Sequence, residues 1–271
     1  MAGPTTAERG ARKPPDGPEG PDGKARPRRE DTPAARFRRP GPRSLLIALG
    51  AIALIAGTVW LLYGSSWLRA EHVATRGTDV LTPGEVRTAA AVPMGAPLIS
   101  VDTDAIEARL RQELPRIDSV AVERSWPDGI ELVVTERKPV LLLEKGTKFV
   151  EVDANGVRFA TVGKAPAGVP LLRLEVDGSP SLNRFGPDRL VAEAVRVRSE
   201  LPAKVAADLQ SMKVVSYDYI SLELSGNRTV VWGSSGEGGV KARALEALMK
   251  AAPEAGHFDV SAPSAPASSG S

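Results

Sequence analysis

The chain has 271 residues, with 35 Lys and Arg against 33 Asp and Glu, so its overall charge favours no particular class of partner. It contains no cysteine, which excludes disulfides, thiol nucleophiles and cysteine-based zinc sites. The length allows two small domains. Charge is distributed unevenly, because basic residues gather in the N-terminal tail, towards Ser44.

Residues 1–43 are rich in Pro, Gly, Arg and Ala, with one aromatic side chain, Phe37. Such a segment buries too little apolar surface to offset its ordering entropy, so we expect it to be disordered. Its last basic residues could bind anionic lipid or nucleic acid. We interpret them instead as topology determinants for membrane insertion and expect no nucleic-acid partner. These residues are Arg36, Arg38, Arg39 and Arg43.

Residues 44–68 contain no charged side chain, and their densest apolar part is Leu45–Tyr63. About 20 helical residues cross a ~30 Å hydrocarbon core, so this run predicts a transmembrane helix in the lipid bilayer. Trp60, Tyr63 and Trp67 lie towards its C-terminal end, where amphipathic rings prefer the headgroup layer. We predict these three residues to be membrane-interface anchors.

A cleaved signal peptide is the main alternative to an uncleaved span. Signal peptides have a shorter apolar core near the N-terminus, followed by small residues at the cleavage site. Here the core follows a long tail and ends in the bulky pair Trp67-Leu68, which favours the anchor. Because positive charge stays inside, we expect a single-pass protein of the cytoplasmic membrane with a cytoplasmic N-terminus and extracytoplasmic C-terminal domains.

Residues 71–139 predict the order strand, helix, helix, strand, strand. Thr82–Glu85 combines a capping box with a proline at the first helical position. A second helix is indicated from about Asp102, with apolar residues at i, i+4 and i+8. Two alternating strands then flank the turn Pro127-Asp128-Gly129, which is typical of a β-hairpin.

Residues 140–262 alternate strand and turn signals, including an Asn-Gly turn at 155–156. The pattern predicts two helices, at about 187–201 and 240–252. A last short strand is expected at 257–261. Residues 263–271 are rich in Ala, Pro and Ser, and we expect them to be disordered.

Several segments together carry a family resemblance. The first module resembles a POTRA domain. The whole chain from about 39 to 263 resembles the FtsQ/DivIB family of bacterial cell-division proteins. The motifs are SWPDGIELVVTERKPV, ISLEL followed by NRTVVWG, KARALEALM and FDVSAP. The predicted fold class is α+β: a single transmembrane helix (44–68), a POTRA domain (71–139, β-α-α-β-β) and a second α+β domain (140–262) with a mainly antiparallel sheet.

The resemblance implies a non-enzymatic scaffold of the divisome at the septum, which links early and late division proteins and helps control septal peptidoglycan synthesis. The implied partners are FtsB/DivIC-like and FtsL-like membrane proteins and the septal peptidoglycan synthases. In the family, a small partner adds a strand near the last strand by β-augmentation. Carried onto this chain, the candidate residues are Phe258, Asp259, Val260 and Ser261. The alternative is that these residues merely close the sheet.

Catalytic patterns are weak in this sequence. His72 and His257 are far apart without metal-ligand spacing, and the loop at 233–239 lacks the G-K-[ST] ending of a phosphate-binding loop. We therefore expect no enzyme activity, cofactor, metal or small-molecule substrate. Two alternatives stay open: a POTRA-containing envelope transport or secretion component, which needs a β-barrel, and a membrane-tethered cell-wall hydrolase, which needs convergent perturbed groups.

Overall fold

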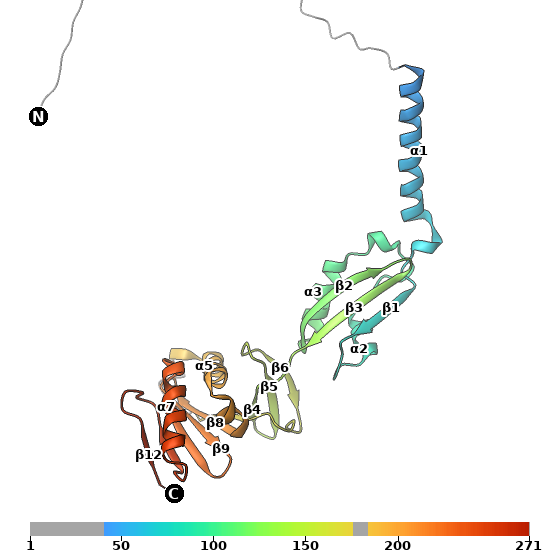
Figure 1. Ribbon diagram of the computed structural model, residues 1–271. Coiled ribbons are helices and arrows are strands. Elements are labelled where there is room, and N and C mark those ends of the chain that lie inside the picture. Colours follow the sequence, from blue (N-terminus) through green and yellow to red (C-terminus); the bar gives the residue numbers. More distant parts are fainter. Residues whose placement is uncertain (1–40, 176–183, 271) are drawn as a thin grey trace, which may run out of the picture. The chain divides into compact units, whose positions relative to one another are not determined.

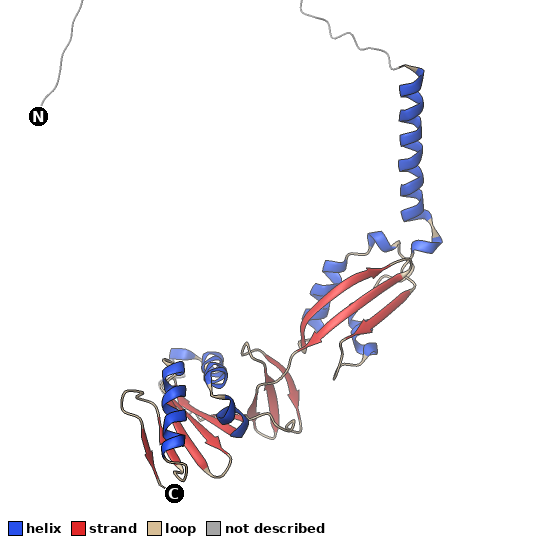
Figure 2. Cartoon of the chain, in the orientation of Figure 1, coloured by secondary structure: helices blue, strands red, loops and turns tan. Residues whose placement is uncertain are grey.

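The computed structural model describes residues 41–175 and 184–270. Residues 1–40 of the N-terminal tail, for which we predicted disorder, lie outside the described residues. They include three of the predicted topology determinants, Arg36, Arg38 and Arg39. Figure 1 shows a long helix, α1, and two regions of mixed helix and strand, which are coloured by secondary structure in Figure 2.

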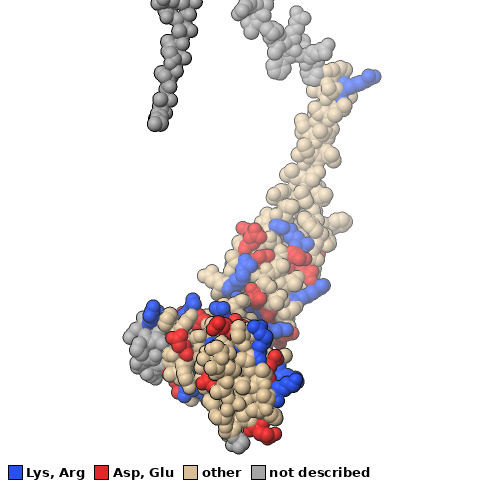
Figure 3. Space-filling view, turned by 60° about the vertical axis from the view of Figure 1, so that its left-hand side comes forward, with Lys and Arg blue, Asp and Glu red and all other residues tan. Residues whose placement is uncertain are grey.

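Helix α1 (Pro42–Gly64) is long and apolar enough to cross a membrane. Its surface in Figure 3 is almost entirely uncharged, whereas acidic and basic side chains are interspersed over the domains that follow. The helix ends slightly before the predicted boundary at 68, because a separate 3-10 turn, η1 (Ser66–Leu68), is capped by the Ser65 hydroxyl.

The first domain has the predicted β-α-α-β-β order. Its sheet has the strand order β1-β3-β2, in which β1 is parallel and β2 antiparallel to the central strand β3. The elements are β1 (His72–Arg76), α2 (Pro83–Ala90), η2 (Leu98–Ser100), α3 (Thr103–Glu113), β2 (Ile117–Ser125) and β3 (Gly129–Glu136).

Helix α2 begins as the sequence predicts. The Thr82 hydroxyl accepts a hydrogen bond from the Glu85 backbone N–H, and the Glu85 carboxylate accepts from the Thr82 N–H at 2.8 Å. This reciprocal pair satisfies two backbone donors that the first helical turn leaves free. Both helices then bury apolar residues against one face of the sheet, as shown by the fully buried Val86, Leu110 and Leu132.

The second domain contains a nine-stranded sheet within the described residues, with the order β12-β11-β10-β9-β8-β7-β4-β5-β6. Most neighbouring strands are antiparallel, which confirms the predicted class. The strands are β4 (Leu141–Lys145), β5 (Lys148–Val152), β6 (Arg158–Val162), β7 (Leu171–Leu174), β8 (Leu209–Ser216), β9 (Tyr219–Leu224), β10 (Arg228–Gly233), β11 (His257–Asp259) and β12 (Ala267–Ser269).

Within the described residues, this sheet is accompanied by the helices α5 (Pro187–Glu200), α6 (Ala203–Asp208) and α7 (Gly238–Ala251). The long helices α5 and α7 match the predicted segments, and their apolar faces join the sheet in one core that includes Leu190, Leu245 and Trp232. The short helix α6 was not predicted, because six residues offer too little periodicity to distinguish a helix from a loop.

The C-terminal tail differs from the prediction of disorder for 263–271. Residues Ala267–Ser269 form strand β12, which pairs antiparallel with β11. Composition missed this strand because its ladder is made by backbone groups, which Ala and Ser carry as any residue does. The same finding shows that β11, which contains the start of the candidate partner-binding segment 258–261, is not the outermost strand of the described sheet.

Candidate partner-binding edge

The candidate site is built on the unit β10–α7–β11. The β9–β10 hairpin turns at Gly226 and Asn227, both with positive φ (71° and 62°), as a tight hairpin requires. After β10 the chain crosses over through α7 and returns as β11, which therefore runs parallel to β10. The crossover places β11 beyond β10, with α7 packed near it.

Strand β11 is anchored on its inner side. Phe258 is 1% exposed and Val260 is fully buried, and both belong to the core of the second domain. The backbone continues this attachment, because Thr229 N–H donates to the Gly256 carbonyl at 2.8 Å and Val260 N–H donates to the Val231 carbonyl at 2.9 Å. Two of the four predicted partner-binding side chains thus face the core.

The other two predicted residues, Asp259 and Ser261, interact with each other. The Asp259 carboxylate accepts hydrogen bonds from the Ser261 hydroxyl at 2.7 Å and from the Ser261 backbone N–H at 2.9 Å. The hydroxyl bond is the main reason that the pKa of Asp259 is lowered, and nearby His257 adds to the effect. This turn ends the strand, so the chain leaves the direction of β11 at Ser261.

The outer side of β11 means here the side opposite β10. Backbone groups alternate along a strand, so with Gly256 C=O and Val260 N–H directed to β10, the N–H and C=O groups of His257 and Asp259 point outward. In the structure they face β12, with His257 opposite Ser269 and Asp259 opposite Ala267. A further bond, from Gly256 N–H to the Gly270 carbonyl, lies at the end of this ladder.

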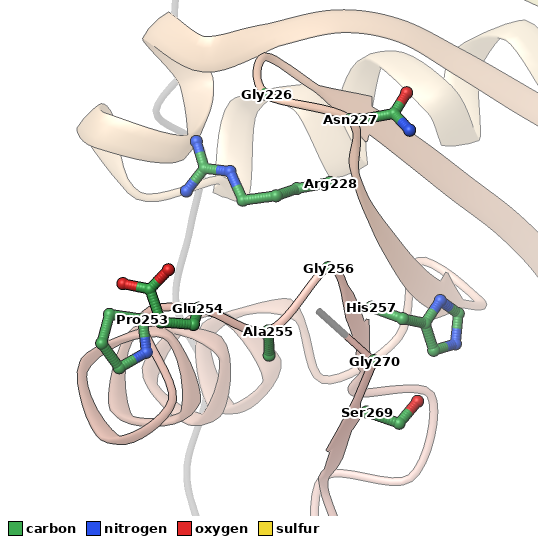
Figure 4. A pocket seen from close by; sticks show the side chains of 10 residues that line it. All are labelled: Gly226, Asn227, Arg228, Pro253, Glu254, Ala255, Gly256, His257, Ser269 and Gly270. Atoms are coloured by element: carbon green, nitrogen blue, oxygen red, sulfur yellow. The ribbon is translucent and has the colours of Figure 1, made fainter.

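An open hollow of about 460 Å³ lies at the start of β11 (Figure 4). Figure 4 shows the hairpin residues Gly226–Arg228 on one side of it and the start of β11, with Ser269 and Gly270, on the other. Arg228 is held by the Asp208 carboxylate at 2.8 Å and the Ser225 carbonyl at 3.0 Å. On the neighbouring strands, the Thr229 hydroxyl and His257 Nδ1 are 2.8 Å apart.

The predicted membrane residues lie elsewhere. Trp60 and Tyr63 lie in the last turns of α1, Trp67 lies in η1, and all three side chains are exposed. Arg43 is the second residue of α1. Their roles at the lipid interface and in topology stay predictions.

Sequence reasoning missed Ala267–Ser269, the residues of β12 that cover the outer side of β11. No side-chain pattern indicates them, because the strand is short and contains no apolar alternation. It also missed His257 as part of the site, although this residue directly precedes the predicted motif. The signal that could have found it is its position two residues before Asp259, on the same side of the strand.

A helix long and apolar enough to span a membrane, followed by a β-α-α-β-β domain and a second α+β domain, defines a class of proteins that carry a POTRA-type module. The family model "POTRA domain, FtsQ-type" matches residues 68–137. The match coincides with the first domain and contains its whole sheet.

Relatives extend the similarity to the full chain. The chain is 62% identical over 274 residues to the cell division protein FtsQ of Streptomyces venezuelae, and the match covers 100% of this chain and 99% of the relative. The FtsQ of Streptomyces coelicolor is 61% identical over 100% of both chains. The solved extracytoplasmic domain of DivIB from Geobacillus stearothermophilus matches with a TM-score of 0.32 at 17% identity, covering 43% of this chain and 94% of that one. The chain belongs to the FtsQ family of cell division proteins.

Proposed function

We propose that the protein is a non-enzymatic scaffold of the division machinery. Helix α1 crosses the cytoplasmic membrane with its N-terminus in the cytoplasm, and both folded domains lie outside at the division septum. Membership of the FtsQ family and the apolar span support this proposal. Arg43 at the start of α1, with the basic residues before it, supports the orientation.

The observation that carries the proposal is the geometry of β11. Strand β11 is fixed by a buried inner face and directs backbone donors and acceptors to its outer side, which pairs with β12, and an extended peptide can pair with groups of this kind. We assign this side to a small single-span partner of the FtsB/DivIC type. An FtsL-like protein joins the same complex, through which the scaffold helps control septal peptidoglycan synthases.

The geometry also indicates different roles for the four predicted residues. Phe258 and Val260 hold the strand against the core, so their side chains position the edge without touching the partner. The outward backbone groups of His257 and Asp259 make the ladder, and the turn at Ser261 sets its end. Because the ladder extends only from His257 to the turn at Ser261, few alignments of the partner strand are possible.

A photo-crosslinking experiment in dividing cells tests this assignment. The crosslinker belongs at the exposed His257 and Ser261, because Phe258 and Val260 are buried. Lys148, exposed on β5 near the other end of the sheet order, is the matched control. We expect a small single-span protein to be trapped from 257 and 261. Crosslinks only from the first domain or from position 148 would contradict the site.

A backbone substitution separates strand pairing from side-chain recognition. Asp259→Pro removes an outward N–H, whereas Asp259→Ala removes the same carboxylate and keeps the donor. We expect Asp259→Pro to lose most of the crosslinked partner and Asp259→Ala to retain it. Equal yields from the two folded variants would show that the partner does not pair with this backbone.

The division role itself is tested by imaging. A fluorescent fusion to the N-terminus of the full chain should gather in bands at division sites. Uniform fluorescence around the envelope would contradict a septal scaffold, even if the crosslinks at β11 were found.

A further inference from the structure

We propose that the C-terminal tail is a built-in competitor for the partner-binding edge, and that an incoming strand displaces β12 from the outer side of β11. The inference rests on the proposed function of β11 as a docking strand. It starts from one observation: the outward groups of His257 and Asp259 already face Ser269 and Ala267 of the same chain.

The tail strand and the strand that it covers differ in how firmly they are held. Strand β11 contributes the buried Phe258 and is followed by the buried Val260. Strand β12 has three residues, of which Ala267 and Ser269 are exposed and Ser268 is half-buried. Its attachment therefore depends on a short backbone ladder, and net hydrogen-bond contributions are only about 1 kcal/mol each.

The outer side of β12 is a poorer alternative for a partner. Ala267 and Ser269 direct their backbone groups to β11, so by alternation Ser268 is the one residue of this strand whose N–H and C=O point outward. Pro266, the residue directly before β12, has no backbone N–H to offer. A strand that displaces β12 instead meets both outward residues of β11 and the Gly256 N–H.

The occupant expected on the freed edge is an extended segment rich in β-branched residues. Val and Thr favour the extended backbone and pack better on a pleated surface than the Ala and Ser of the tail. The tail has the advantage of its tether, because residues 261–266 connect it to the edge and keep its effective concentration high, of the order of millimolar.

The consequence is a conditional affinity. A binding site that is covered for most of the time binds with an affinity reduced by the fraction that is free. If the tail covers β11 for nine-tenths of the time, a partner binds about tenfold more weakly than to an open edge. The tail thus allows binding only by segments whose affinity for the outer side of β11 is high enough to displace β12.

The test uses the full chain in detergent and a fluorescent ten-residue peptide of alternating Val and Thr as the probe, with binding followed by anisotropy. Ala267→Pro removes an N–H directed to β11 and so opens the tail. Ser268→Pro, its matched control, removes an N–H directed away from β11. A third variant, His257→Cys with Ser269→Cys, locks the tail by a disulfide in a chain that has no other cysteine.

We expect Ala267→Pro to bind the peptide about tenfold more tightly than the unchanged chain. Ser268→Pro should bind as the unchanged chain does. The oxidised double-cysteine variant should lose binding and regain it on reduction, which also shows that the variant is folded.

Two results would overturn the inference in distinguishable ways. If Ser268→Pro abolishes binding while Ala267→Pro changes nothing, the peptide adds to β12, and the docking edge stands one strand further out without displacement. If no variant binds the peptide, including the opened one, the edge accepts no strand, and the proposed docking function fails with it.

Discussion

The backbone N–H of Val260 donates to the carbonyl of Val231 at 2.9 Å, and this bond determines which side of β11 faces away from β10. It directs the Val260 donor inward, so the neighbouring donor, on Asp259, points outward. A proline at 260 therefore disturbs the attachment of β11 to β10, whereas a proline at 259 disturbs the edge.

We predict that Val260→Pro destabilises the attachment of β11 more than Val260→Ala does, by about 1–3 kcal/mol. Both variants remove buried methyl groups, but only proline leaves the Val231 carbonyl without its donor. Hydrogen exchange of the amides in β10 and β11 measures the difference. Equal protection in the two variants would show that the bond adds nothing to the stability of the strand.

Gly77, directly after β1, has a φ of 80°, and a Cβ at this position would lie 2.1 Å from the Val134 carbonyl oxygen. We predict that Gly77→Ala destabilises the first domain by at least about 2 kcal/mol, because strain and a backbone clash add together. Gly146→Ala is the control, since Gly146 also has a positive φ but has open space around it. That variant should cost only about 1 kcal/mol. Thermal unfolding that shifts equally in both would contradict the close approach.

Glu136 ends β3 and holds the loop before α2. Its carboxylate accepts hydrogen bonds from the backbone N–H groups of Asp79, Val80 and Leu81 at 2.8, 3.0 and 2.9 Å. We predict that Glu136→Gln lowers local stability by about 1–3 kcal/mol, because the neutral amide is a weaker acceptor for three donors. Exchange rates of these three amides report the loss. Glu113→Gln, at an exposed carboxylate in α3, should leave them unchanged.

The capping box predicts a pH dependence. The pKa of Glu85 is lowered, first by the hydrogen bond from the Thr82 backbone N–H and then by the Thr82 hydroxyl. A carboxyl group whose pKa is lower when folded contributes stability above its unfolded pKa, and that contribution is lost as the pH falls through the folded pKa. Glu85→Gln should therefore lower the stability of α2 at neutral pH and have little effect at pH values below the folded pKa. An equal effect of the substitution at both pH values would exclude the charged cap.

Much of the fold could be predicted because its signals are local. The capping box at Thr82–Glu85, the turn at 127–129 and the periodicity of α5 and α7 each depend on a few consecutive residues, and the structure has all of them. Helix α6 and the 3-10 turns were missed because they are too short for periodicity to show.

The candidate edge was predicted only in part. The motif at 258–261 indicated a strand, but alternation along so short a segment does not say which side chains face a core. The structure answers this by pairing Phe258 with Val230 in the parallel ladder and burying both.

The apolar span, the order of elements in the first domain, the two long helices of the second domain and the family resemblance all follow from the amino-acid sequence, because they depend on composition, local propensity and motif. The position of β11 between β10 and β12 is visible only in the folded chain. Strand neighbours are chosen by backbone groups that every residue carries, so pairing between Phe258 and Ser268 leaves no trace in the amino-acid pattern.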